Sequence, residues 1–153
     1  MTTSMSPRLR RSPSRDAACP PVRIVVVDDH SLVRSSIRRV LGTAGDMEWV
    51  GEASDGTQAV EIVTRTQPDV VLMDLSMPGV DGLVATRLIV SCCPATQVLV
   101  LTSSVDPARV RLSLGAGAAG VLTKDGDPAT ILAGIRSLVD GVPTGQPVSD
   151  PGR

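Results

Sequence analysis

Short runs of apolar, mostly β-branched residues recur along this chain, and each is followed directly by a polar residue. The runs are Ile24-Val25-Val26-Val27, Val70-Val71-Leu72-Met73, Val98-Leu99-Val100-Leu101 and Gly120-Val121-Leu122. Runs of this length and composition are typical of strands that are buried on both faces of a sheet. Between them, apolar residues recur at helical spacing. This alternation predicts right-handed βαβ units and a parallel sheet with helices on both faces.

The same patterns predict five strands and five helices. We expect strands over about residues 23–27, 48–53, 69–73, 97–101 and 119–122, and helices over about 31–44, 56–66, 82–92, 106–114 and 128–140. Ser31 is the expected N-cap of the first helix, and Pro107 and Pro128 suit the first turns of the last two helices. The predicted fold class is therefore α/β, with a doubly wound five-stranded parallel sheet.

The composition agrees with one packed domain. The chain has 153 residues, of which 42% are hydrophobic and 20% charged, enough for a sizeable core. With no Phe, no Tyr and one Trp, that core must consist mainly of aliphatic side chains.

The net charge of −1 gives no support for a nucleic-acid-binding domain. No apolar stretch reaches the ~20 residues of a membrane span, and three cysteines without metal-ligand spacing indicate reduced thiols in a cytoplasmic protein.

The chain divides into three parts. Residues 1–21 are rich in Ser, Pro and Arg and lack apolar periodicity, which predicts a disordered tail. Residues 22–141 contain all the alternating strand and helix patterns and form the predicted domain. Residues 142–153 are rich in Pro and Gly and are expected to be a flexible C-terminal tail.

Residues with chemically useful side chains follow four of the predicted strands. Asp28 and Asp29 follow the first strand, Asp74 the third, Thr102 the fourth and Lys124 the fifth. Because the carboxyl ends of parallel strands meet at one edge of the sheet, where ligands bind, we expect these side chains to gather there. Carboxylate oxygens are the ligands that Mg²⁺ prefers, and a hydroxyl and an ammonium suit the charge of a phosphoryl group.

Two other classes of protein fit the sequence less well. A phosphatase with an aspartyl-phosphate intermediate usually carries a second acid two residues after its nucleophile, where this chain has Ser76. A Rossmann dinucleotide-binding domain needs glycine in the first strand–helix turn, so that the pyrophosphate can approach. Here that turn reads Asp28-Asp29-His30-Ser31, and its acids would repel phosphate.

These motifs together resemble the receiver domain of two-component response regulators, which has the CheY-like, or flavodoxin-like, fold. The resemblance covers about residues 22–141. It rests on the acid pair Asp28-Asp29 and on the segments Asp74-Leu75-Ser76-Met77-Pro78-Gly79-Val80-Asp81-Gly82, Leu101-Thr102-Ser103 and Gly115-Ala116-Gly117-Ala118-Ala119-Gly120-Val121-Leu122-Thr123-Lys124. Asp28-Asp29-His30 and Ala133-Gly134-Ile135-Arg136 most resemble receivers that precede a helix-turn-helix DNA-binding domain.

The resemblance implies a signalling phosphoprotein rather than an enzyme, although such domains assist their own phosphorylation and dephosphorylation. Asp74 would accept a phosphoryl group from the phosphohistidine of a sensor histidine kinase. The Mg²⁺ ligands would be Asp28, Asp29, Asp74 and the backbone carbonyl of Ser76. Lys124 and Thr102 would contact phosphoryl oxygens. His30 is expected to be a variable loop residue, and a homodimer on phosphorylation is a further expectation.

Two departures from the family pattern leave an alternative open. The residue three before the lysine is usually aromatic in this family, but here it is Val121, which predicts a weaker or different conformational readout. After Gly141 only 12 residues remain, too few for a helix-turn-helix domain. We therefore expect a stand-alone or truncated receiver without direct DNA binding. The alternative is a degenerate receiver that acts only as a protein-interaction module.

Overall fold

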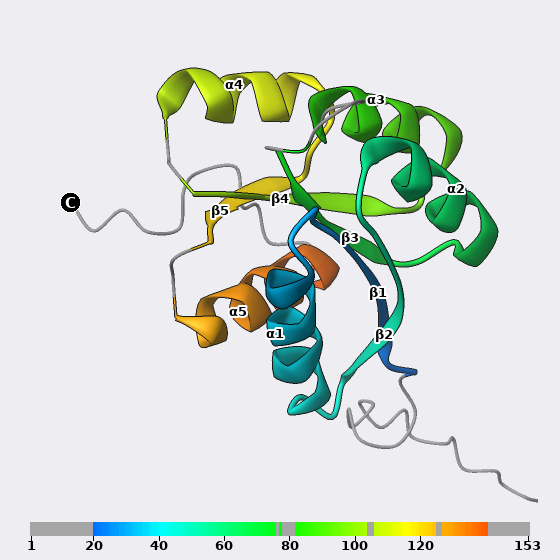
Figure 1. The fold of residues 1–153 in the computed structure, drawn as a ribbon, viewed down its shortest axis with the longest axis vertical. Coiled ribbons are helices and arrows are strands. Elements are labelled where there is room, and N and C mark those ends of the chain that lie inside the picture. The colour runs from blue at the N-terminus through cyan, green and yellow to red at the C-terminus, as the bar shows by residue number, and fades with distance from the viewer. Residues whose placement is uncertain (1–19, 76, 78–81, 104–105, 125–126, 141–153) are drawn as a thin grey trace, which may run out of the picture.

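All five strands of the protein lie parallel in one sheet. The computed structural model describes residues 20–75, 77, 82–103, 106–124 and 127–140. The strands are β1 (Val22–Val27), β2 (Met47–Ala53), β3 (Val70–Asp74), β4 (Gln97–Thr102) and β5 (Gly120–Thr123). They are arranged in the order β2-β1-β3-β4-β5 (Figure 1), which confirms the predicted fold class.

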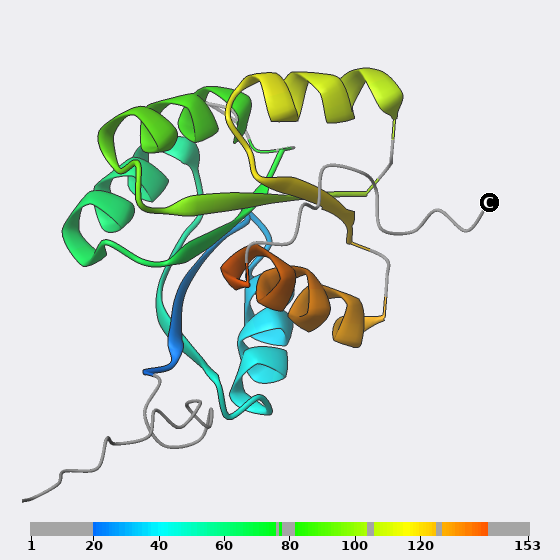
Figure 2. The same cartoon turned by 180° about the vertical axis from the view of Figure 1, so that it is seen from behind.

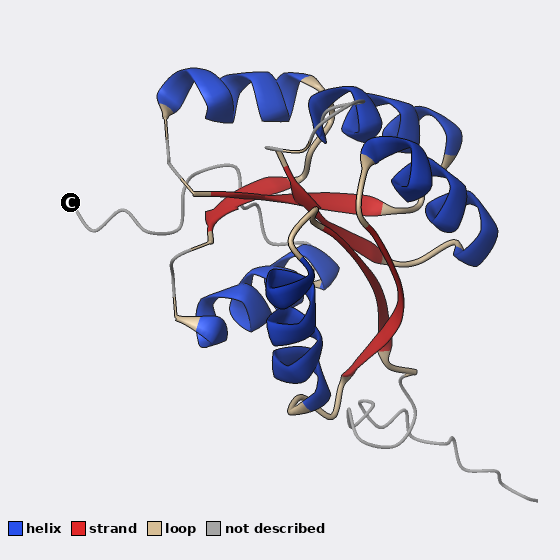
Figure 3. Cartoon of the chain, in the orientation of Figure 1, coloured by secondary structure: helices blue, strands red, loops and turns tan. Residues whose placement is uncertain are grey.

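Helices cover both faces of the sheet (Figure 3). The helices are α1 (Ser31–Gly42), α2 (Gly56–Thr66), α3 (Gly82–Cys92), α4 (Pro107–Gly115) and α5 (Pro128–Val139). The helices α1 and α5 lie on one face, and α2, α3 and α4 lie on the other, as the view from behind in Figure 2 also shows. This is a three-layer arrangement with the sheet in the middle.

The apolar runs supply two separate cores because successive strand residues point to opposite faces. Val25, Val27, Val71 and Met73 pack on the side of α2, α3 and α4, in the company of fully buried Ala59. On the other side Ile24, Val26, Val70, Leu72 and Ile135 of α5 form the second core. Small aliphatic side chains let the helices approach the sheet closely, so the fold is built without Phe or Tyr.

The element boundaries fall within two residues of those expected, but one cap differs. Ser31 is already the first residue of α1, and the N-cap position belongs to His30, whose side chain makes no capping hydrogen bond. The prediction of Ser31 as N-cap is therefore wrong. Pro107 and Pro128 do lie in the first turns of α4 and α5, where a missing N–H costs nothing.

Several predictions fall on residues that the structure does not describe. The N-terminal tail lies outside the described residues except for its last two residues, and so do the C-terminal tail, Ser76 and most of the loop between β3 and α3.

Trp49 on β2 is half-buried and packs against the core under α1, with the Arg38 guanidinium 3.9 Å above the centre of its ring. Within the described ranges, no helix is both long and apolar enough to cross a lipid bilayer.

Candidate functional site

The carboxyl edge of the sheet collects the acidic residues that the sequence singled out. Asp28 directly follows β1, which lies between β2 and β3 in the sheet, and its backbone N–H still bonds to the Ala53 carbonyl of β2 at 3.1 Å. Asp74 is the last residue of the neighbouring strand β3. Both side chains are almost completely buried, at 1% and 2% exposure. The protein therefore holds two acids side by side away from bulk water, where like charges repel most strongly.

The Lys124 ammonium lies between these two buried acids. Its Nζ is 2.8 Å from Asp28 Oδ2 and 3.3 Å from Asp74 Oδ1. Lys124 directly follows β5, and its backbone N–H donates to the Thr102 carbonyl at 2.8 Å, which fixes where the side chain starts. The predicted approach of Asp28, Asp74 and Lys124 is thus present, and a single cation offsets part of two negative charges.

The pKa of Lys124 reflects the competition between burial and its acidic neighbours. Burial on its own lowers the pKa of the ammonium, since a charged group loses hydration. The hydrogen bond to Asp28 and the charges of Asp74 and Asp28 act in the opposite direction. They outweigh the burial, so the pKa of Lys124 is raised above its ordinary value and the side chain is a cation at neutral pH.

Asp29 and His30 complete the cluster on the side that faces solvent. Ligand atoms of Asp28, Asp29, His30 and Asp74 all lie within 4.8 Å of one another. His30 Nδ1 is 3.2 Å from both Asp28 Oδ1 and Asp29 Oδ1, and the ring itself is 66% exposed. The sequence interpretation treated His30 as a variable loop residue. The structure places its ring beside the acids in the turn between β1 and α1.

The donor atoms of this cluster fit a hard divalent cation. Asp28 Oδ2 and Asp29 Oδ1 are buried, and among the described residues their polar contacts are the ion pairs with Lys124 and His30 given above. Carboxylate oxygens that lack full hydrogen bonding retain lone pairs for a metal. Oxygen-rich sites of this kind suit Mg²⁺, which uses few carboxylates and keeps several waters.

Thr102 lies at the same edge of the sheet, as predicted. It is the last residue of β4 and is 3% exposed. The register pairs Asp74 with Leu101 and pairs Thr102 with Thr123, so Thr102 stands one position beyond Asp74 along the strand direction. The predicted ligand Ser76 lies outside the described residues.

Arg34 is a neighbour of the site that sequence reasoning missed. Its Nη1 donates to the backbone carbonyl of Asp28 at 2.6 Å, and its Nε lies 3.4 Å from Glu52 Oε1 on β2. The helical pattern of α1 places Arg34 away from the apolar stripe, so periodicity alone does not predict these contacts. The signal in the sequence is its position four residues after His30, because residues four apart on a helix lie on the same face. Arg34 therefore lies on the face of α1 that starts at the acidic turn.

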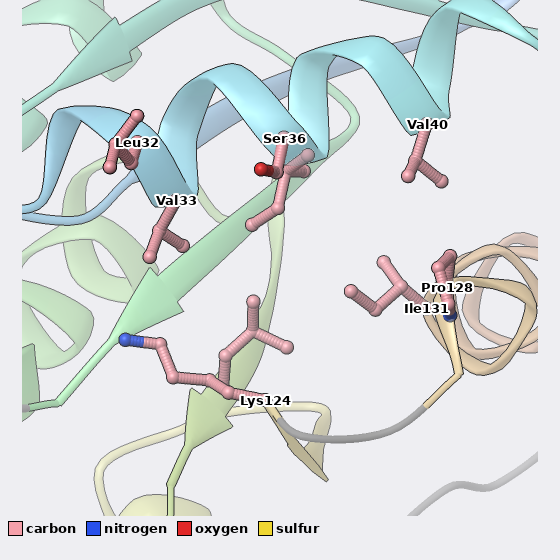
Figure 4. Close-up of a pocket in the computed structure, with 9 residues that line it drawn as sticks. Leu32, Val33, Ser36, Val40, Lys124, Pro128 and Ile131 are labelled. Carbon is pink, nitrogen blue, oxygen red and sulfur yellow. The ribbon is translucent and has the colours of Figure 1, made fainter.

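An apolar groove begins beside Lys124 and runs between α1 and α5. Its volume is about 280 Å³, and it is lined from α1 by Leu32, Val33, Ser36, Ile37 and Val40 and from the other side by Leu101, Lys124, Pro128 and Ile131. Figure 4 shows the α1 side chains facing Pro128 and Ile131 across this groove. The Lys124 stem lines the groove.

Comparisons with known proteins agree on one family. The family model described as the response regulator receiver domain matches residues 24–136. The transcriptional regulatory protein DegU of Brevibacillus brevis is 38% identical over 120 residues, which are 78% of this chain and 51% of that protein. The response regulator UvrY of Escherichia coli K12 is 42% identical over 123 residues, 78% of this chain and 55% of UvrY. The chain thus spans about half the length of the curated relatives it matches.

Solved structures give the same answer. A two-component response regulator of the LuxR family from Aurantimonas sp. SI85-9A1 superposes with a TM-score of 0.78 at 35% identity, over 81% of this chain and 89% of that one. The response regulator domain of Thermotoga maritima CheB gives a TM-score of 0.74 at 29% identity, over 78% of this chain and 97% of that one. Both identities are high enough for the likeness to concern the family as well as the fold.

Proposed function

This chain belongs to the response regulator receiver family, a class of signalling modules, and we propose that its phosphoacceptor is Asp74. The phosphoryl group would come from the phosphohistidine of a sensor histidine kinase. One observation carries this proposal: the Lys124 ammonium lies within 3.3 Å of buried Asp74 and 2.8 Å of buried Asp28, at the edge where Asp29 also gathers.

The transfer itself is a substitution at phosphorus. A bond forms between a carboxylate oxygen of Asp74 and the phosphorus atom while the phosphorus–nitrogen bond of the phosphohistidine breaks, leaving a neutral imidazole on the kinase and an acyl phosphate on Asp74. Catalysis of such a step consists mainly of positioning and charge neutralisation. Lys124 supplies one positive charge next to the acceptor, and the buried position of Asp74 limits the water that could hydrolyse the product.

Asp28, Asp29 and Asp74 would hold Mg²⁺, with the Ser76 carbonyl as a further ligand by family resemblance. The ion supplies charge neutralisation between the acceptor and the incoming phosphoryl group. The residues of this chain then act around it: Lys124 pairs with the phosphoryl oxygens, and the Thr102 hydroxyl at the end of β4 donates to them. Acceptance and later hydrolysis would thus be assisted by the receiver itself.

We infer the location, oligomeric state and wider role of the protein from its family as well. We retain residues 22–141 as the bounds of the receiver, place the protein in the cytoplasm and expect phosphorylation to favour a homodimer. DegU is described as a transcriptional regulatory protein. We propose that this chain serves regulation of transcription through such a phosphorelay, without contacting DNA by the described domain.

The decisive test is the intact mass of the full chain after incubation with Mg²⁺ and acetyl phosphate. We expect a gain of one phosphoryl unit, which disappears in Asp74→Asn and when the divalent cation is chelated. Asp69→Asn is the matched control, because Asp69 precedes the same strand at its opposite, exposed end. A gain that persists in Asp74→Asn, or is also lost in Asp69→Asn, would contradict Asp74 as the specific acceptor. No gain in a folded parent protein would favour the degenerate receiver that only binds partners.

A further inference from the structure

Two adjacent cysteines lie at the C-terminal end of α3, near the edge of the sheet opposite to the acidic cluster. Cys92 is the last residue of α3 and is exposed, whereas Cys93 is 2% exposed and belongs to the core under α2 and α3. The backbone N–H of Cys93 still bonds to the Ile89 carbonyl at 2.7 Å, so both residues follow the helix. Their Sγ atoms nevertheless lie only 3.5 Å apart.

The end of α2 holds this pair in place. Gln67 Nε2 donates to Cys93 Sγ at 3.6 Å and also to the Thr64 carbonyl at 2.9 Å, and Thr64 Oγ1 lies 4.0 Å from Cys92 Sγ. Gln67 adopts a left-handed conformation with φ of 50° at the C-cap of α2, which is uncommon for a residue with a side chain. The helices α2 and α3 run side by side in both views (Figures 1 and 2). The thiols are thus oriented by a neighbouring helix.

A disulfide between these residues does not fit the backbone. Disulfide-linked residues have Cα atoms roughly 4.4–6.8 Å apart, whereas adjacent Cα atoms across a trans peptide are about 3.8 Å apart. A bridging atom fits better. For an atom bonded to each sulfur at about 2.3 Å, the observed Sγ–Sγ distance of 3.5 Å corresponds to an angle of about 100° at that atom.

We propose that Cys92 and Cys93 form a vicinal dithiol site that chelates trivalent arsenic. Zinc sites in proteins use three or four protein donors, mainly Cys, His and carboxylates, and the described neighbours of the two thiols offer only a hydroxyl and an amide. Monosubstituted trivalent arsenic needs only two sulfur ligands and has angles close to a right angle. The site is independent of the phosphoacceptor, which lies at the other end of the strands.

The reaction is a condensation without change of oxidation state. With an organoarsenic oxide, two arsenic–sulfur bonds form, the arsenic–oxygen bond breaks, and the two thiol protons leave with the oxygen as one water. Burial and the neighbouring Cys92 raise the pKa of the Cys93 thiol, so this proton is present at neutral pH and available for the departing oxygen. Exposed Cys92 offers the entry point, and Cys93 closes the chelate.

The test uses the full, reduced chain and phenylarsine oxide, followed by intact mass. We expect one adduct per chain that survives excess monothiol and is removed by a dithiol. Cys92→Ser should weaken binding by about 100-fold or more, because a second ligand on the same molecule acts at high effective concentration. Cys19→Ser, which removes the third cysteine, should bind like the parent.

Because Cys92 is exposed, we expect Cys92→Ser to fold like the parent protein. Cys93→Ser alters a buried residue, so circular dichroism would check that this variant is folded. A dithiol-reversible adduct that persists in Cys92→Ser, is lost in Cys19→Ser, or joins two chains would overturn the proposal. Asp74→Asn should bind the probe unchanged, which separates this site from the phosphoacceptor. An adduct that excess monothiol removes would equally contradict chelation.

Discussion

At the scale of single residues, the Lys124 ammonium offsets part of the negative charge at the acidic edge. It is the cation that contacts both Asp28 and Asp74, and its own side chain is 19% exposed. Removing one member of a largely buried ionic cluster leaves the other charges uncompensated. The folding stability of the protein, and not only its chemistry, should therefore depend on this side chain.

We predict that Lys124→Met lowers the free energy of unfolding by about 2 kcal/mol in the absence of divalent cations, less than for a fully buried pair because the Lys124 side chain is 19% exposed. Saturating Mg²⁺ should recover most of this loss, because it neutralises the same acids. Urea unfolding with chelator and with Mg²⁺ measures both effects. Arg65→Met, which removes an exposed cation of α2, should change little. An equal loss with and without Mg²⁺ would show that the effect comes from packing alone.

The pH dependence of this stabilisation has a definite sign. Because the folded-state pKa of Lys124 is raised above its ordinary value of 10.5, the stabilisation is fully present below the pKa of the unfolded chain. It is lost as the pH rises through the higher pKa of the folded protein. The stability difference between parent and Lys124→Met should stay constant near neutrality and shrink only above about pH 10.5. A decrease already near neutral pH would contradict this assignment.

At the scale of elements, the start of α3 is fitted tightly against the end of β3. A Cβ atom at Gly82 would collide with the Asp74 carbonyl oxygen and come within 2.8 Å of Leu75 Cα. Both partners are backbone atoms and cannot rotate away. The absence of a side chain at Gly82 thus lets α3 begin directly behind the acceptor strand.

Gly82→Ala should therefore destabilise the protein by roughly 3 kcal/mol, at the upper end of typical overpacking costs, and reduce phosphorylation of Asp74. Gly115→Ala at the end of α4 is the matched control, since a Cβ there meets no atom within 4 Å. Thermal unfolding and the phosphorylation assay would compare the two. A normal melting temperature in Gly82→Ala would mean that α3 can shift without disturbing β3.

Sequence patterns predict strands, helices and the edge where the site forms, because periodicity and strand direction determine these features. They do not predict the ring position of His30 or the reach of Arg34 to the Asp28 carbonyl. Both contacts depend on the path of one turn and on rotamers that only tertiary packing selects. The prediction of Ser31 as N-cap failed for a related reason: the helix begins at Ser31 itself, so the N-cap position belongs to His30.

At the scale of the whole molecule, the sheet separates two chemically distinct ends. Acids and Lys124 occupy the carboxyl edge, whereas the two thiols lie at the opposite edge. Between them, Val121 on β5 pairs with Val100 on β4 and is 1% exposed within the core under α4. A buried valine offers no large side chain that could move between the core and the surface at this position.

We predict that phosphorylation changes amide hydrogen exchange near the ends of β3 and β4, and much less in β5 and in α4, which packs over Val121. The short, already buried Val121 side chain is the physical reason for this limit. Hydrogen exchange followed by mass spectrometry, with Asp74→Asn as the unmodified control, would measure it. Changes of comparable size in β5 and α4 would contradict this limit and show that the response does not need an aromatic side chain at position 121.

Lys124 is the only lysine in the 153-residue sequence, and the remaining basic residues are arginines. Apart from the chain's own N-terminus, amine-directed reagents therefore have a single target, which is the ammonium held between Asp28 and Asp74. The labelling rate at that one amine therefore reports directly on how strongly the acidic edge holds the Lys124 ammonium. Any ligand that engages or frees the ammonium would register as a change in one peptide, without an engineered probe.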